Sequence, residues 1–176
     1  IGKFSYINPG LGIAGGNIER DIKTLKDLST SLDIKDNFFK FLNKDNKYYK
    51  DWLFLQINKY NLNKHKIGIL GITYKEDTLS CKNAVSVNLI KKLEIQNVYL
   101  HDRRFKNLIL SKKIKERFND IKFILNNCEI IIILHKIKDY ETIDLNNKKI
   151  KCIIDPFKIT KGTLRKSKVK YLSLFD

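Results

Sequence analysis

Apolar residues in the first third of the chain recur at the spacing of an α-helix. They follow one another every three or four residues, which predicts a first helix, at Ile18, Ile22, Leu25, Leu28 and Leu32. A second helical pattern, rich in aromatic residues, runs over residues 36–60. The polar residues 43–47 allow a break within it.

From residue 66 onward the pattern changes, because short apolar runs alternate with helical stretches. The apolar runs predict strands over 66–73, 97–102, 128–134, 150–155 and 171–175. Helical stretches are expected from an N-cap at Asn83 and over 111–120, with a helical turn over 139–143. This alternation predicts the α/β class: a helical segment over 1–64, followed by a Rossmann-like, doubly wound parallel sheet over 65–176.

Composition narrows the class of protein. The chain has 176 residues and is 43% hydrophobic, which suffices for a packed core. Three scattered cysteines are too few for a disulfide scaffold and indicate a cytoplasmic protein with reduced thiols. The longest apolar run, 130–134, is far too short to span a membrane. The chain begins with Ile1 and has no methionine, so we expect a fragment of a longer protein.

The net charge of +16 raises the alternative of a nucleic-acid-binding module. Only five of the 35 basic residues are arginine, and the lysines are spread along the whole chain. Proteins that read nucleic acids usually cluster basic residues and favour arginine, so no nucleic-acid partner is expected. A basic surface still attracts an anionic ligand such as a nucleotide.

Two segments carry candidate chemistry. The loop over 74–82 follows the first predicted strand, and Lys75 and Lys82 flank the predicted helix start, where phosphate is a natural ligand. The alternative is a solvated loop with incidental lysines. The other segment, YINPGLGIAGGN over 6–17, is rich in glycine and allows a ligand to approach the backbone closely. The three histidines share no ligand spacing with each other or with the cysteines, so no metal site is predicted.

Taken together, these segments resemble one family. PGLGIAGGNIERDIKTL over 9–25 resembles the active-site loop G-F-G-G-x-C-x-P-K-D of the nucleotide-sugar 6-dehydrogenases, which act on UDP- and GDP-sugars. GITYKEDT over 71–78 is similar to the start of the motif G-L-x-F-K-x-x-T-x-D-x-R-x-S-P, which opens the family's C-terminal nucleotide-binding domain. Weaker similarity continues in VYLHD over 98–102 and IID over 153–155.

The resemblance implies a role for each half of the chain. Residues 1–64 would be the active-site loop and the end of the central helical region, through which family members form homodimers, and the stripe over 38–52 fits such a contact. Residues 65–176 would be the domain that binds the UDP-sugar. The NAD cofactor would be bound mainly by a Rossmann domain upstream of this chain.

Residue by residue, the resemblance implies catalytic roles for Asn17 and Asp21. Asn17 stands where the family has its catalytic cysteine, whose thiol forms a thioester in the second of two oxidations; an amide cannot form that adduct. Asp21 matches an aspartate associated with activating water, although an acid in the first turn of a helix also stabilises the helix. Implied substrate-binding residues are Tyr6, Asn8, Gly10, Gly12, Gly15, Tyr74, Lys75 and Lys82.

The second motif also departs from the family pattern. Ser80 replaces its aspartate and Lys82 its arginine, which keeps the charge but loses the bidentate fork. The resemblance implies part of an NAD-dependent dehydrogenase that oxidises the C6 alcohol of a UDP-sugar toward a uronic acid. The alternatives are a homologue that has lost the cysteine-dependent second oxidation, and the basic nucleic-acid-binding module.

Overall fold

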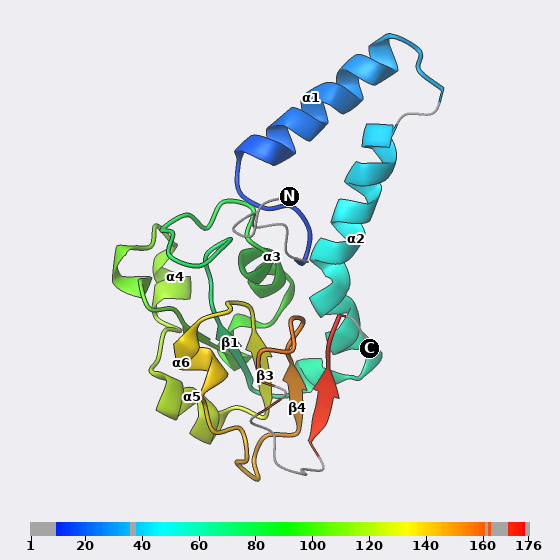
Figure 1. Cartoon of the computed structure of the whole chain (residues 1–176). Helices are drawn as coiled ribbons and strands as arrows, with labels where there is room; N and C mark the ends of the chain where they lie inside the picture. The colour runs from blue at the N-terminus through cyan, green and yellow to red at the C-terminus, as the bar shows by residue number, and fades with distance from the viewer. Residues whose placement is uncertain (1–9, 36–37, 161, 163–168, 175–176) are drawn as a thin grey trace.

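The apolar runs pair into one five-stranded sheet in the computed structural model, which describes residues 10–35, 38–160, 162 and 169–174 (Figure 1). The strands are β1 (Ile67–Leu70), β2 (Val98–His101), β3 (Ile130–Ile133), β4 (Cys152–Ile154) and β5 (Lys170–Leu172). They lie in the order β2-β1-β3-β4-β5, and every neighbouring pair is parallel. The predicted parallel α/β fold is confirmed.

Helices cover both faces of the sheet, because alternate strand residues point to opposite sides. Ile69 and its register partner Ile132 face α2 (Phe38–Lys59) and α3 (Val85–Lys92), and form one core cluster with them. Leu70 and Ile133 belong to a second cluster, which includes residues of α5 (Ile121–Asn127) and α6 (Lys138–Glu141). The sheet is therefore doubly wound, and its switch from one winding direction to the other falls between β1 and β3.

The cysteines of the strand regions are core residues, as their apolar neighbours predict. Cys128 and Cys152 are buried on different faces of the sheet. Burial raises the pKa of the Cys128 thiol to about 12 and that of Cys152 to about 11. Both are therefore neutral packing groups at physiological pH.

Two helices extend away from the sheet (Figure 1). α1 (Asn17–Ser31) packs along α2, and α2 continues into the sheet core through Leu53 and Ile57. α2 runs unbroken through residues 43–47, because that polar stretch contains no glycine or proline to interrupt it. Among the described residues, no helix is long and apolar enough to cross a membrane.

The region after β2 differs from its prediction. The helix expected over 111–120 is wrong, since only α4 (Lys112–Lys115) is helical there. Phe118 instead forms a parallel bridge with Leu100. The helix that the pattern missed is α5, which Asp120 caps by accepting a hydrogen bond of 2.7 Å from the Phe123 backbone N–H. Short 3-10 turns complete the described elements at η1 (Leu62–Lys64), η2 (Ile95–Asn97) and η3 (Phe105–Asn107).

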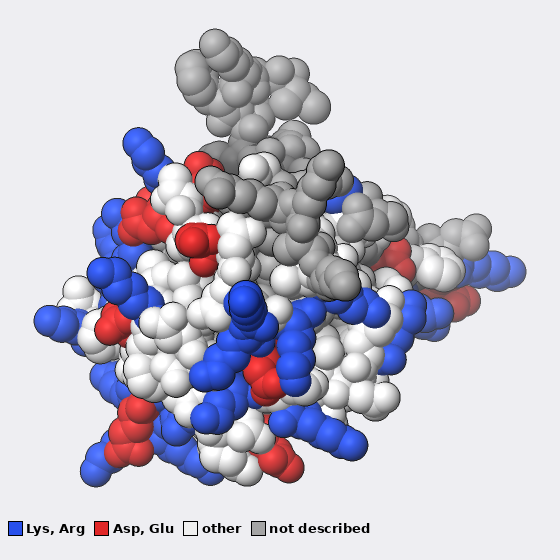
Figure 2. Space-filling view, turned by 90° about the horizontal axis from the view of Figure 1, so that it is seen from below, with Lys and Arg blue, Asp and Glu red and all other residues white. Residues whose placement is uncertain are grey.

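Basic and acidic side chains both occur on the face of the molecule that lies at the bottom of Figure 1. Figure 2 shows Lys and Arg side chains recurring across that face, with Asp and Glu among them. The positive potential is thus spread over this face, which favours anionic ligands in general.

Glu129 gives the fold one acid-sensitive contact. It precedes β3 and pairs with His65 Nδ1 at 3.0 Å and with Lys151 Nζ at 2.5 Å, which connects the starts of β1, β3 and β4. The hydrogen bond from Lys151 is the main cause that lowers the pKa of Glu129 from 4.5 to about 2.

A carboxyl group whose pKa is lower in the folded than in the unfolded protein stabilises the fold at pH values above its unfolded pKa. That stabilisation is lost as the pH falls through the folded pKa. We expect Glu129→Gln to lower stability by up to about 1 kcal/mol at pH 6, because the pair is partly exposed. The difference should shrink between pH 4.5 and about 2. Thermal unfolding of both proteins at pH 6, 4 and 2 checks this, and a constant difference at all three values would contradict it.

Candidate functional site

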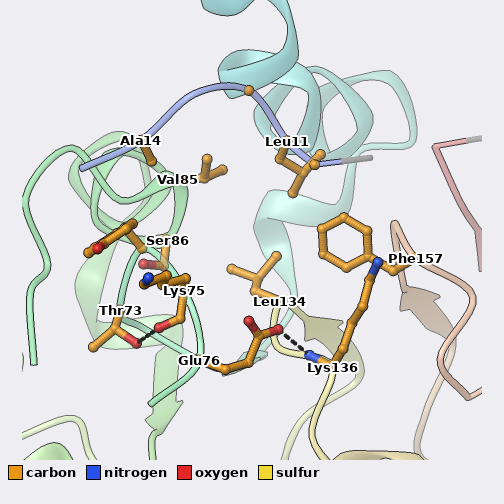
Figure 3. A pocket seen from close by; sticks show the side chains of 13 residues that line it. Leu11, Ala14, Thr73, Lys75, Glu76, Val85, Ser86, Leu134, Lys136 and Phe157 are labelled. Atoms are coloured by element: carbon orange, nitrogen blue, oxygen red, sulfur yellow. Dashed lines mark hydrogen bonds between the residues drawn. The ribbon is translucent and has the colours of Figure 1, made fainter. Parts of the chain in front are cut away.

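A cavity of about 440 Å³ opens beyond the carboxyl ends of β1 and β3 (Figure 3). This is the switch point of the sheet, the place where open α/β sheets bind ligands. Three parts of the chain form its walls: the segment between β1 and α3, the segments after β3 and β4, and the loop before α1. The lining residues are Gly10, Leu11, Gly12, Ala14, Thr73, Tyr74, Lys75, Glu76, Val85, Ser86, Leu134, Lys136 and Phe157.

Buried polar contacts fix the wall that follows β1. Asp102, at the end of β2, accepts hydrogen bonds from the backbone N–H of Ile72 at 2.9 Å and of Thr73 at 3.5 Å. The Thr73 hydroxyl donates to the carbonyl oxygen of Lys75 at 2.8 Å. His135, from beyond β3, places its Nε2 3.0 Å from the Thr73 carbonyl oxygen. These contacts set the direction in which the chain presents Lys75 to the cavity.

The opposite wall joins the ends of β3 and β4. The Glu76 carboxylate accepts a hydrogen bond of 2.7 Å from the Lys136 backbone N–H, and the Lys136 ammonium lies 4.6 Å from the centroid of the Phe157 ring. Burial alone would raise the pKa of Glu76, but hydrogen bonds from the backbone of Lys136 and of Glu76 itself bring it below its usual value. In Figure 3, Phe157 and Lys136 stand across the cavity from Thr73, Lys75 and Ser86.

The loop over residues 10–16, called here the glycine loop, closes the remaining side. Gly12 has φ +87°, and a Cβ there would lie 2.7 Å from Asn46 Oδ1. Gly15 has φ +90°, and its backbone approaches the Tyr74 ring so closely that a Cβ would lie 3.3 Å from it. The positive φ favours glycine at both positions, and at Gly12 a Cβ would also overlap Asn46.

The structure brings most of the described substrate-binding candidates together. Tyr74, Lys75, Gly10 and Gly12 line the cavity. Gly15 and Lys82 lie next to it, and the Gly15 N–H donates to the Lys82 carbonyl oxygen at 3.1 Å. The two remaining candidates, Tyr6 and Asn8, lie outside the described residues.

The two implied catalytic residues lie at the start of α1. Asn17 is the first residue of the helix and is exposed. Asp21 is also exposed, and it accepts two hydrogen bonds of 3.1 Å from Arg20. Neither side chain is among those that line the cavity, so their catalytic roles stay predictions.

The prediction that Asn83 caps α3 is wrong. The helix begins at Val85 after an extended Ala84, and Asn83 adopts a left-handed conformation with φ 55°. Its side-chain amide donates instead to the Gly15 carbonyl oxygen at 3.1 Å and to the Glu19 carboxylate. Asn83 therefore connects the glycine loop to the segment before α3.

Sequence reasoning missed five polar or aromatic residues of the cavity, namely Thr73, Glu76, Ser86, Lys136 and Phe157. Lys136 and Phe157 follow the predicted third and fourth strands by two residues, so the general rule for parallel sheets could have found them.

Chemically, the cavity offers two ammonium groups, one carboxylate, backbone groups and two aromatic rings, those of Tyr74 and Phe157. That set suits an anionic ligand with a flat, partly apolar portion. Among the described residues, no group of three or more His, Cys, Asp or Glu side chains could hold a metal ion.

A dinucleotide-binding site in the glycine loop is less well supported than a site for an anionic ligand in the cavity. Gly10, Gly12 and Gly15 have the spacing of G-x-G-x-x-G, but α1 leads into α2 instead of a parallel strand. The strand–helix–strand unit that gives this fingerprint its meaning is therefore not formed after α1.

Comparison with known proteins identifies the second half of the chain. Residues 68–162 match the model of the UDP-glucose/GDP-mannose dehydrogenase family, UDP binding domain. This match spans more than half of the chain and includes most of the cavity walls. No curated protein matches the sequence.

Several solved dehydrogenases share the fold. The GDP-mannose dehydrogenase from Pseudomonas aeruginosa is 15% identical, with a TM-score of 0.74 over 94% of this chain and 41% of its own. The UDP-glucose dehydrogenase from Pyrobaculum islandicum is 21% identical, with a TM-score of 0.70 over 92% of this chain and 38% of its own. An NDP-N-acetyl-D-galactosaminuronic acid dehydrogenase from Methanosarcina mazei Go1 is 15% identical, with a TM-score of 0.70 over 95% of this chain and 39% of its own. The chain thus spans about two fifths of the length of these relatives.

Proposed function

Because this chain belongs to the UDP-glucose/GDP-mannose dehydrogenase family, we propose that its switch-point cavity binds the UDP portion of a nucleotide sugar. The observation that carries the proposal is the placement of Lys75 and Lys136 on two walls of one cavity, with the Phe157 ring beside Lys136.

A nucleoside diphosphate requires compensation for its charge and a surface for its base. Lys75 follows β1 and lies near the first turn of α3, whose unpaired N–H groups favour phosphate. The Ser86 hydroxyl in that turn donates to the Ile72 carbonyl oxygen, which fastens the helix start to the end of β1. Phe157 and Leu134 supply apolar contact for the uracil ring.

Calorimetric titration with UDP, UMP and inorganic phosphate tests the proposal. We expect saturable UDP binding, with weaker binding of UMP because it lacks the second phosphate. Inorganic phosphate alone should bind weakest, since it makes no contact with Phe157. Equal binding of phosphate and UDP, or no binding of UDP, would contradict the assignment.

We further propose that the protein takes part in oxidation at C6 of the bound UDP-sugar. NAD would accept the hydride when bound. No residue of this chain is assigned to NAD binding, because α1 is followed by α2 and not by the parallel strand that a G-x-G-x-x-G dinucleotide site requires. Asp21 can accept a proton as a carboxylate, and the Asn17 amide can hydrogen-bond a hydrated aldehyde without forming a covalent adduct.

The number of NADH molecules formed per UDP-sugar by the complete protein distinguishes the outcomes. Two would mean oxidation to the uronic acid, and one would mean that the reaction stops at the aldehyde. None would leave binding as the function.

The proposed compartment is the cytoplasm, where free thiols such as Cys81 stay reduced.

We also propose that the protein forms a homodimer through α1 and α2. Large apolar side chains remain exposed on both helices, at Ile18, Leu25, Leu28, Phe38, Phe41, Tyr48 and Tyr49, and at Leu32 just after α1. Exposed apolar surface of this extent typically marks an interface.

Burying a charge in such an interface is costly, so Leu28→Glu should weaken self-association about tenfold. Ile109→Glu is the matched control, because Ile109 is 95% exposed and lies outside both helices. Sedimentation velocity at several concentrations measures the effect. A monomeric parent protein, or equal effects of the two variants, would refute the interface.

A further inference from the structure

Two asparagine side chains, one on α2 and one in the segment before α3, hold the glycine loop in place. On α2, half-buried Asn46 accepts a hydrogen bond of 2.5 Å from the Ile13 N–H at Oδ1, and its amide donates to the Ile13 carbonyl oxygen at 3.4 Å. Gly12 packs against the same side chain. Asn46 therefore binds both polar backbone groups of Ile13 and fixes the middle of the loop.

Asn83 holds the far end of the loop. Its amide donates to the Gly15 carbonyl oxygen at 3.1 Å, while the Gly15 N–H donates to the Lys82 carbonyl oxygen. The same amide also contacts the Glu19 carboxylate, which is paired with Lys50 of α2. The loop is thus tied both to α2 and to the segment that precedes α3.

The glycine loop presents no charged side chain to the cavity. It contributes Gly10, Leu11, Gly12 and Ala14, whereas every charged lining residue comes from the sheet side. Phosphates will lie toward the lysines, so a neutral group attached to the diphosphate is what the loop can contact. Backbone N–H and C=O groups suit the hydroxyls of a sugar.

We propose that Asn46 and Asn83 are positioning residues that hold the glycine loop against the sugar of a bound nucleotide sugar. This inference rests on the proposed function, because it requires UDP to occupy the sheet side of the cavity. Its consequence is a separation of effects: loss of either asparagine reduces affinity for UDP-glucose and leaves affinity for UDP nearly unchanged.

Asn83→Gly isolates the side chain of Asn83. Glycine adopts the left-handed conformation of φ 55° without strain, so the substitution removes the amide and keeps the backbone. Asn61→Gly is the matched control, since Asn61 has φ 53° and lies before η1, away from the cavity lining.

The experiment is calorimetric titration of the unaltered chain and both variants with UDP and with UDP-glucose. Asn83→Gly should weaken UDP-glucose binding about three- to tenfold, the scale of one neutral hydrogen bond, and change UDP binding less than about twofold. Asn61→Gly should change neither. Unchanged UDP-glucose affinity in Asn83→Gly, or an equal loss for both ligands, would overturn the inference. Absence of UDP binding by the unaltered chain would instead overturn the proposed function, and this inference with it.

Asn46 provides a second test with its own rescue. Asn46→Ala removes the acceptor for the Ile13 N–H, whereas Asn46→Asp keeps an oxygen there. We expect Asn46→Ala to weaken UDP-glucose binding to a similar extent and Asn46→Asp to recover most of the loss. If the two variants are equally weak, or if Asn46→Ala binds like the parent, Asn46 has no positioning role.

Discussion

Replacing Lys75 with alanine is expected to weaken UDP binding ten- to a hundredfold. Lys75 lines the cavity immediately after the turn that Asp102 and Thr73 hold in place. Its ammonium lies 5.7 Å from the Tyr74 ring centroid, and no ion pair among the described residues engages it. It is therefore available to a phosphate, and a hydrogen bond between charged groups contributes about 1.5–3 kcal/mol.

Lys82→Ala is the control for this prediction. Lys82 carries the same charge, but its side chain packs against Gly16 and does not line the cavity. We expect its loss to reduce UDP affinity less, through the general positive potential alone. Calorimetry on the three proteins measures both effects. Equal affinities of the parent and Lys75→Ala would remove this lysine from the site.

Gly71→Ala should destabilise the protein by about 3 kcal/mol. Gly71 follows β1 directly with φ +94°, and a Cβ there would lie 2.5 Å from the Cγ of the His135 ring. A left-handed alanine costs about 1–2 kcal/mol, and crowding in a packed site adds about 1–3 kcal/mol. The buried His135 ring has little room to move, because it also contacts Thr73.

Urea unfolding measures this change, with Gly162→Ala as the matched control. A Cβ at Gly162 would meet nothing within 4 Å, so that variant should stay within about 0.5 kcal/mol of the parent. His135→Ala removes the ring that a Cβ at position 71 would meet. Adding Gly71→Ala to the His135→Ala protein should therefore lower stability by less than it does in the parent. A Gly71→Ala protein as stable as the parent would contradict the account of this turn.

The sheet could be predicted because its signals are local. Isoleucine-rich runs such as 130–133 are buried on both faces and are typical of central parallel strands, and their alternation with helices determines the fold class. The position of Lys75 at the cavity could be predicted for the same reason, since it lies two residues after the apolar run 66–73, at the edge where parallel sheets bind ligands.

The remaining parts of the site depend on contacts between distant segments. Asn83 has the residue type of an N-cap, but its hydrogen bond to Gly15 places it in a left-handed turn before the helix. Lys136 and Phe157 meet only because β3 and β4 are neighbours in the sheet. No local pattern encodes such pairings, and the catalytic roles of Asn17 and Asp21 likewise stay predictions.

A crystal structure of the chain with UDP tests the central claim most directly. We predict that UDP occupies the switch-point cavity, with a phosphate oxygen about 2.7–2.9 Å from the Lys75 ammonium and the uracil ring toward Phe157. UDP ordered elsewhere on the protein, or an empty cavity in crystals grown at a UDP concentration that saturates binding in solution, would contradict the claim.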